Sequence, residues 1–329
     1  IYALPRDGKA LGTDDVLQSP IPLYTAASLM ENIYSPVFSG CLLACEGRRF
    51  DAARSLQRID ELGSTIYNGA PPHFAMMCDL PDTSQPERLE LMITGGSAFT
   101  RPLFEKIRRR WPQVAVANWF GLMESGSGQT LNWGEDMERE PDTLGRPVWP
   151  TEARVVDADL NDVEVGGEGE LWLRAPGQIE GYFKNPEQTA KRLHEGWLRT
   201  GDRVVETEDG RFRGRGRGED RINRGGFKFY PVEIETVLEA HPDVREAAAI
   251  GISHEVLGEN VVAFVVHGDG GEVGEEELRT YCRQSLAPNK IPARIYFEES
   301  LPRNAYGKVV RKQLRELIEQ REASAAEPG

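Results

Sequence analysis

Three charged side chains of this sequence lie in glycine-rich loops, where their chemistry would suit a nucleotide. Glu124 follows a strand-like run, and a carboxylate in such a loop is suited to hold a Mg²⁺ ion that bridges phosphate oxygens. Asp202 follows a glycine in a tight turn and can accept hydrogen bonds from two neighbouring ribose hydroxyls. Lys308 follows a glycine near the end of the chain, and its positive charge suits a carboxylate and a phosphoryl oxygen. Each also has a plain structural interpretation, as a solvated loop charge, a turn cap and a surface lysine respectively.

Two further segments of the sequence are rich in glycine. Gly95, Gly96 and Ser97 follow a strand-like run, and glycines there let the backbone approach a ligand closely, although a simple strand-to-helix turn would also use them. Residues 214–220 are rich in glycine and in charged side chains, which predicts a linker. Arg217 stands at the edge of this segment, where it could meet a ribose or a phosphate.

The elements that must position these residues differ along the chain. Residues from about 15 to 125 alternate short apolar runs with amphipathic helices, as in the strand-like runs 91–94 and 114–119 and the helical stretch 100–111 between them. This pattern predicts an α/β layer with a parallel sheet. Ligands bind such sheets at the carboxyl ends of the strands, which is where the glycines after residue 94 would lie.

The sequence after about residue 143 predicts a different architecture. Between about 143 and 217, short β-rich pieces are broken by glycine and Asp/Asn turns, which predicts a small β subdomain. A compact α+β unit follows, with a helix that begins at Pro231, two strands at 247–252 and 261–266, and two more helices. The predicted fold class is therefore α/β, with a partial large domain and a smaller α+β domain after it.

The composition excludes several classes of protein. The 329 residues are 39% hydrophobic and carry a net charge of −14, which argues against a general nucleic-acid binder because such a surface repels phosphates. No apolar run approaches the roughly 18 residues of a membrane span. The four cysteines lack the spacing of a zinc site, and we expect free thiols and a cytoplasmic protein.

Read in order, the five segments resemble the adenylate-forming superfamily of acyl-CoA synthetases, luciferases and peptide-synthetase adenylation domains. The most specific matches are Gly-Asp at 201–202, the run from Gly-Arg at 216–217 to Pro-Val-Glu-Ile-Glu at 231–235, and the run from Leu-Pro-Arg to Gly-Lys at 301–308. Gly-Glu-Leu at 169–171 and the run 181–189 match the family's β-subdomain signature. The resemblance implies that residues 1–218 form part of an AMP-binding domain, with its β subdomain at about 143–217. Residues 219–329 would form a mobile C-terminal lid.

The resemblance also implies a role for individual residues. Glu124 would bind Mg²⁺, Asp202 would hold both ribose hydroxyls with help from Arg217, and Lys308 would bridge the substrate carboxylate and the α-phosphate. Glu219 aligns with the hinge of the lid, and Gly226 with a glycine that leaves room for pantetheine. The remaining nucleotide- and acyl-binding positions would be Gly95, Gly96, Ser97, Asn118, Trp119, Phe120 and Gly121, with Trp119 and Phe120 near adenine.

The activity implied by the family consists of two half-reactions, in which a carboxylic acid and ATP give an acyl-adenylate and pyrophosphate, and the acyl group then passes to a thiol. The stretch 286–292 resembles free-standing ligases, which favours CoA as the acceptor. The alternatives are a carrier-protein pantetheine, an amine, or a chain that is not catalytic by itself. His73 and Phe74 are expected to flank the acyl pocket and would suit an aryl or medium-chain acid, although a core or turn role for His73 fits equally well.

The sequence departs from the family pattern at four points. Met123 stands where the family usually has Thr, Phe120 replaces a commoner Tyr, and Tyr306 precedes the Gly-Lys pair where a small residue is common. The glycine- and Ser/Thr-rich phosphate loop of the family is not found, and the chain opens on Ile1. We therefore expect a fragment of a longer enzyme, inactive without its N-terminal region.

Overall fold

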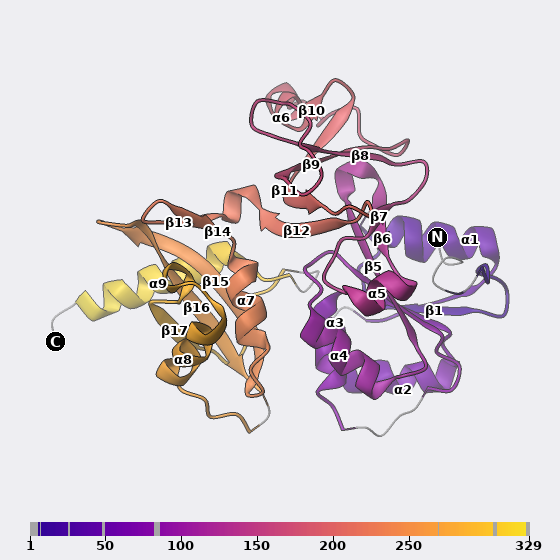
Figure 1. The fold of residues 1–329 in the computed structure, drawn as a ribbon. Helices are drawn as coiled ribbons and strands as arrows, with labels where there is room; N and C mark the ends of the chain where they lie inside the picture. The colour runs from indigo at the N-terminus through magenta and orange to yellow at the C-terminus, as the bar shows by residue number, and fades with distance from the viewer. Residues whose placement is uncertain are drawn as a thin grey trace. The chain divides into compact units, whose positions relative to one another are not determined.

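The computed structural model describes residues 6, 8–25, 27–47, 50–81, 86–268, 270–304 and 308–326. Contacts divide the chain into two compact units, Ile1–Gly214 and Arg215–Gly329, and each has its own apolar cores (Figure 1). No helix in the described part of the chain has the length and apolar character needed to cross a bilayer. The described residues confirm the predicted fold class, a mixed α/β unit followed by a smaller α+β unit.

The first unit is built on a sheet that, over the described residues, has seven strands in the order β2-β1-β3-β4-β5-β6-β7. The strands from β2 to β5 are parallel, as the alternation of strands and helices predicted, while β6 and β7 join the edge in antiparallel fashion. The strands are β1 (Val16–Ser19), β2 (Leu42–Cys45), β3 (Ile66–Gly69), β4 (Leu91–Gly95), β5 (Ala115–Leu122), β6 (Ser127–Asn132) and β7 (Arg146–Pro147).

Successive side chains of the central strands enter two different cores. Met92 and Val116 pack with the helices α2, α3 and α4, whereas Leu91 and Ala117 pack on the other face of the sheet. This is the period of two that a strand buried on both faces requires. The helical segments of this unit are η2 (Ser28–Tyr34), α1 (Ser35–Ser39), α2 (Ala52–Leu62), α3 (Pro71–Cys78), α4 (Arg101–Arg110), η3 (Met123–Ser125) and α5 (Gly134–Arg139).

A second sheet forms the predicted β subdomain. Its strands follow the order β10-β11-β9-β8, and β12 also pairs with β11. The predicted linker at 214–220 is wrong in part, because its first residues belong to β12 and residues 218–220 form the short turn η4. The elements are β8 (Glu152–Val156), β9 (Glu168–Arg174), α6 (Pro186–Arg192), β10 (Leu193–His194), β11 (Trp197–Glu206), β12 (Phe212–Arg217) and η4 (Gly218–Asp220).

The second unit places helices on both faces of a sheet with the order β14-β13-β16-β15, in which β17 also pairs with β16. Ala249 and Val261 pack with α7 and α8, while Ile250 and Val262 pack with α9 on the opposite face. Pro231 opens α7, as predicted. The elements are β13 (Ile222–Arg224), β14 (Phe227–Phe229), α7 (Pro231–Glu239), β15 (Val244–His254), β16 (Gly258–His267), α8 (Glu275–Ser285), η5 (Pro288–Lys290), β17 (Arg294–Phe297) and α9 (Arg311–Ala326).

Candidate functional site

Glu124 lies in the short turn η3, directly after the carboxyl end of β5. Ser125 closes this turn, because its hydroxyl accepts the Leu122 N–H at 3.1 Å and donates to the Leu122 carbonyl at 2.9 Å. The Gln129 side chain then donates to the Ser125 carbonyl at 3.0 Å. The backbone that carries Glu124 is therefore held from both sides, and Met123, beside it, is 60% exposed.

The Glu124 side chain has a partner that sequence reasoning missed. The Tyr182 hydroxyl donates to Glu124 Oε1 at 2.7 Å. Burial and the neighbouring Glu124 carboxylate together raise the pKa of Tyr182 above its ordinary value, which keeps the phenol protonated as the donor. The only signal in the sequence was that Tyr182 belongs to the run 181–189, which carried the family resemblance but no chemistry of its own.

Asp202 lies in an irregularity of β11, where the register against β9 shifts. Gly201 adopts a φ of 76°, and its N–H donates to Glu170 Oε1 at 3.0 Å. The buried Thr200 hydroxyl accepts the Asp202 N–H at 3.0 Å and donates to the Leu171 carbonyl at 2.7 Å. Irregularities of this kind can re-aim a side chain out of the regular pleat, and Asp202 lies within this one.

Gly95 and Trp119 are directly opposite each other at the carboxyl ends of β4 and β5. A Cβ atom at Gly95 would lie 2.7 Å from the Trp119 carbonyl oxygen, so only glycine fits this pairing. The Trp119 ring packs over Gly128, where a Cβ atom would lie 2.2 Å from the ring. Trp119 itself is only 6% exposed. Trp119 thus belongs to the core of the sheet, and its contact with a base remains a prediction.

The other predicted pocket positions are of two kinds. Asn118 is buried, and its amide donates to the Thr143 carbonyl at 3.3 Å, so its side chain links the sheet to the start of the β subdomain. Gly96, Ser97, Phe120 and Gly121 are exposed or partly exposed around the ends of β4 and β5, and they remain candidates for ligand contact.

His73 and Phe74 are structural residues of α3. His73 Nδ1 accepts the Ala70 N–H at 3.0 Å, and its ring centroid lies 4.5 Å from that of Phe50. Phe74 is buried in the core between the helices and the sheet. His73 thus has a role at the start of this helix, and a contact of either ring with the acid remains a prediction.

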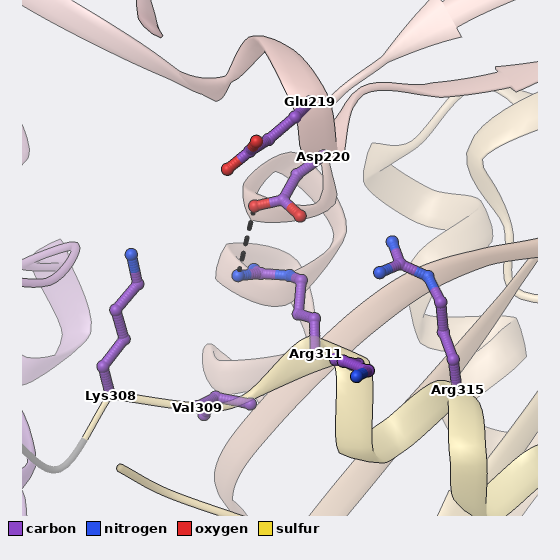
Figure 2. A pocket seen from close by; sticks show the side chains of 7 residues that line it. Glu219, Asp220, Lys308, Val309, Arg311 and Arg315 are labelled. Carbon is purple, nitrogen blue, oxygen red and sulfur yellow. Dashed lines mark ion pairs between the residues drawn. The ribbon is translucent and has the colours of Figure 1, made fainter. Parts of the chain in front are cut away.

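In the second unit, Lys308 and Glu219 line the same cavity of about 340 Å³. Figure 2 shows the Lys308 side chain extending along one side of this cavity, apart from Arg311, which pairs with Asp220. Lys308 is held at its backbone, where its N–H donates to Asn304 Oδ1 at 3.0 Å. The remaining lining residues are Val309, Lys312 and Arg315. Tyr306 lies outside the described residues.

Arg311 pairs with two carboxylates of its own unit. One of its guanidinium nitrogens lies 2.6 Å from Glu235 Oε1 and another lies 3.8 Å from Asp220 Oδ2. Burial alone would lower the pKa of Arg311, but Glu235 and Asp220 outweigh this and raise it. Because Asp220 follows Glu219, the predicted hinge residue, this ion pair connects the hinge segment to the start of α9.

Gly226 forms a tight hairpin turn with Gly225 between β13 and β14. Arg224 pairs with Phe227, and the two intervening glycines have φ angles of 61° and 86°. Positive φ at both central positions is the type I′ turn that matches the twist of a hairpin. A Cβ atom at Gly226 would meet nothing within 4 Å, so the conformation rather than crowding within this chain explains the glycine. Arg217 ends β12 and is partly exposed.

The described residues contain no cluster of three or more His, Cys, Asp or Glu side chains arranged to hold a metal ion. Mg²⁺ at nucleotide sites is commonly held by one or two carboxylates, with water and substrate phosphates completing its shell. Glu124, a partly exposed carboxylate with one oxygen held by a neutral phenol, fits such a site. It does not fit a metal centre built from protein ligands alone.

Comparison with known proteins gives two family models in sequence order. The model described as AMP-binding enzyme matches residues 2–183, and the model described as AMP-binding enzyme C-terminal domain matches residues 233–308. A long-chain-fatty-acid–CoA ligase of Yersinia pestis is 38% identical over 307 residues, which are 92% of this chain and 54% of the relative. A 2-succinylbenzoate–CoA ligase of Geobacillus kaustophilus is 35% identical over 74% of this chain and 49% of the relative.

Among solved structures, the anthranilate CoA ligase AuaEII in complex with anthranoyl-AMP superimposes with a TM-score of 0.88 at 25% sequence identity. The match covers 98% of this chain and 63% of that protein. The chain thus spans about half the length of the two curated relatives described above.

The Asp202 turn gives a prediction about the buried hydroxyl of Thr200. Thr200→Val keeps the shape of the side chain but leaves the Asp202 N–H and the Leu171 carbonyl without this partner, which should lower the free energy of unfolding by about 1–3 kcal/mol. Thr200→Ser retains the hydroxyl and should cost less than the valine variant. Urea unfolding of the two variants measures the difference, and a larger loss in the serine variant would show that methyl packing, not the hydroxyl, holds the turn.

Proposed function

This chain belongs to the AMP-binding enzyme family, and from that membership we propose that it performs the chemistry of an ATP-dependent acyl-CoA synthetase. The observation that carries the proposal is the order of the two family matches, the second of which ends on Lys308. In the proposed reaction, a carboxylate oxygen attacks the α-phosphorus of ATP and the bond to pyrophosphate breaks. The thiol sulfur of CoA then attacks the acyl carbon of the acyl-adenylate, and AMP leaves.

We propose that the first unit binds the nucleotide. Asp202, on its irregular turn, would accept hydrogen bonds from the ribose hydroxyls, and the ends of β4 and β5 would lie against the base and the acid. Glu124 would hold the nucleotide's Mg²⁺ ion, which when bound offsets negative charge on the phosphate oxygens. The rigid turn around Glu124 supports this role, because a ligand carboxylate must keep its position while the phosphates move.

We propose that the second unit contributes Lys308 to the first half-reaction. Its ammonium group would contact the substrate carboxylate and the α-phosphate while negative charge develops there. Glu219 would serve as the hinge about which this unit turns between the two half-reactions. The position of Lys308 and Glu219 on one cavity supports a link between the catalytic loop and the hinge.

The acid is proposed as a class only. One relative is named for long-chain fatty acids, another for 2-succinylbenzoate, and the solved structure for anthranilate. Aliphatic and aryl acids are therefore both represented among proteins similar to this chain. We propose a carboxylic acid as substrate and CoA as acceptor.

Lys308→Ala in the complete protein should separate the two half-reactions. Acid-dependent exchange of pyrophosphate into ATP, measured with benzoate and decanoate as probe acids, should fall by about 100- to 1,000-fold, because the charge beside the α-phosphate is lost. Thioester formation from supplied acyl-adenylate should change little. Lys312→Ala is the matched control, since Lys312 lines the same cavity but has a side chain that is 84% exposed. An equal fall in both half-reactions would contradict the proposed role.

Gly226→Asn tests the acceptor. Asparagine tolerates positive φ, so the hairpin should persist while a side chain enters the space that pantetheine is proposed to use. Transfer to CoA should slow by about tenfold or more with adenylation unchanged, because a small displacement of the thiol is costly. Gly225→Asn, at the neighbouring turn position, should leave both steps unchanged. If the two variants behave alike, the thiol does not pass Gly226.

A further inference from the structure

We propose that Tyr182 is a positioning residue for Glu124, whose phenol fixes the orientation of the carboxylate toward the metal–nucleotide complex. This inference rests on the proposed function, in which Glu124 holds the nucleotide's metal ion. Its physical basis is a set of contacts between the segment 177–182 and the turn η3, which are far apart in the sequence.

Three contacts join this segment to the Glu124 turn. The Ile179 N–H donates to the Glu124 carbonyl at 2.8 Å, and the Tyr182 hydroxyl donates to Glu124 Oε1 at 2.7 Å. Gly126 lies so close to Gly177 that a Cβ atom would come within 2.6 Å of the Gly177 carbonyl oxygen. The segment therefore holds both the backbone and the side chain of Glu124.

Tyr182 is itself anchored to α6. Its N–H donates to Thr189 Oγ1 at 2.9 Å, and the Thr189 hydroxyl donates to the Asn185 carbonyl at 2.9 Å. Asn185 caps α6, because its side chain accepts the Gln188 N–H at 3.1 Å. A continuous series of hydrogen bonds thus runs from the start of α6 through Tyr182 to the Glu124 carboxylate.

The chemistry of the phenol suits this role. A neutral donor fixes one carboxylate oxygen without cancelling the negative charge, whereas an arginine or lysine at this position would offset the charge that a metal ion needs. The bond from Tyr182 uses Oε1 and not Oε2, so it leaves the second oxygen to a ligand. Partners of this kind orient a metal-binding carboxylate, and their loss typically weakens metal binding by about 10- to 100-fold.

A purely structural role for Tyr182 predicts a different outcome. If the hydroxyl only tied the turn to the segment 177–182, its loss would lower stability and weaken nucleotide binding with or without a divalent cation. The Ile179 bond and the Gly126–Gly177 contact do not involve the hydroxyl, so the turn should stay in place in Tyr182→Phe. The variant therefore separates orientation of the carboxylate from attachment of the turn.

The experiment compares Tyr182→Phe, Glu124→Gln and Tyr281→Phe in the complete protein. Tyr281→Phe is the matched control, because it removes a hydroxyl that donates to the Ala240 carbonyl at 3.4 Å and belongs to the second unit. Binding of Mn²⁺ is followed by electron paramagnetic resonance in the presence of α,β-methylene-ATP, together with binding of the analogue without a divalent cation and thermal unfolding. The Mg²⁺ concentration for half-maximal pyrophosphate exchange is measured in parallel.

Tyr182→Phe should weaken Mn²⁺ binding by about tenfold or more and raise the Mg²⁺ requirement, with the rate at saturating Mg²⁺, metal-free binding and the unfolding temperature unchanged. Glu124→Gln should have the larger effect on Mn²⁺. If Glu124→Gln weakens Mn²⁺ binding and Tyr182→Phe does not, the inference is overturned while the proposed function stands. If Glu124→Gln has no effect, the metal role in the proposed function fails as well. If Tyr182→Phe weakens binding of the analogue equally with and without a divalent cation and also lowers the unfolding temperature, the role of the hydroxyl is structural and the inference is overturned.

Discussion

The pairing of β5 with a parallel strand on one side and an antiparallel strand on the other is the constraint on which the site depends. On the parallel side, β5 reaches Trp119 opposite Gly95 only because residue 95 has no Cβ. On the antiparallel side, the Trp119 ring occupies the space where a side chain at Gly128 would be. These close approaches fix the carboxyl end of β5, and the turn that carries Glu124 begins at that end.

The two candidate nucleotide-binding carboxylates of the first unit are presented in different ways. Glu124 is aimed by a phenol from a segment that follows it by more than 50 residues. Asp202 lies at a change of register within its own strand, where the Thr200 hydroxyl and Glu170 accept the backbone N–H groups of Asp202 and Gly201. In the first case a neutral donor holds the carboxylate itself, and in the second the hydrogen bonds hold the backbone that carries it. Groups that are held in place before a ligand arrives cost less to order on binding.

Much of the fold follows from local patterns in the sequence. The period of two in residues 91–94 and 114–119, and the helical spacing between them, are local properties and correctly predict β4, β5 and α4. The prediction of a linker at 214–220 was wrong in part because the glycines of this segment disfavour strands. Pairing with β11 nevertheless makes a strand of residues 212–217. Tertiary pairing thus overrode local propensity in this segment.

The site was predictable to a lesser degree, because its geometry depends on contacts between distant segments. The charged residues Glu124, Asp202 and Lys308 were candidates because each stands in a stretch that contains glycine. The hydrogen bond from Tyr182 and the role of His73 at a helix start have no periodic signature. Nor could the sequence indicate that Trp119 packs in the core, since its ring occupies space left by Gly128 of the neighbouring strand.

The proposed attack of a carboxylate oxygen on the α-phosphorus of ATP is tested most directly by isotope transfer. The complete protein is given ATP, CoA and either benzoate or decanoate with both carboxyl oxygens labelled with ¹⁸O, and the nucleotide product is analysed by mass spectrometry. We expect AMP that carries one ¹⁸O atom per turnover, because the attacking oxygen stays with the phosphate when the thiol displaces AMP from the acyl carbon. Unlabelled AMP, or ADP as the product, would contradict it.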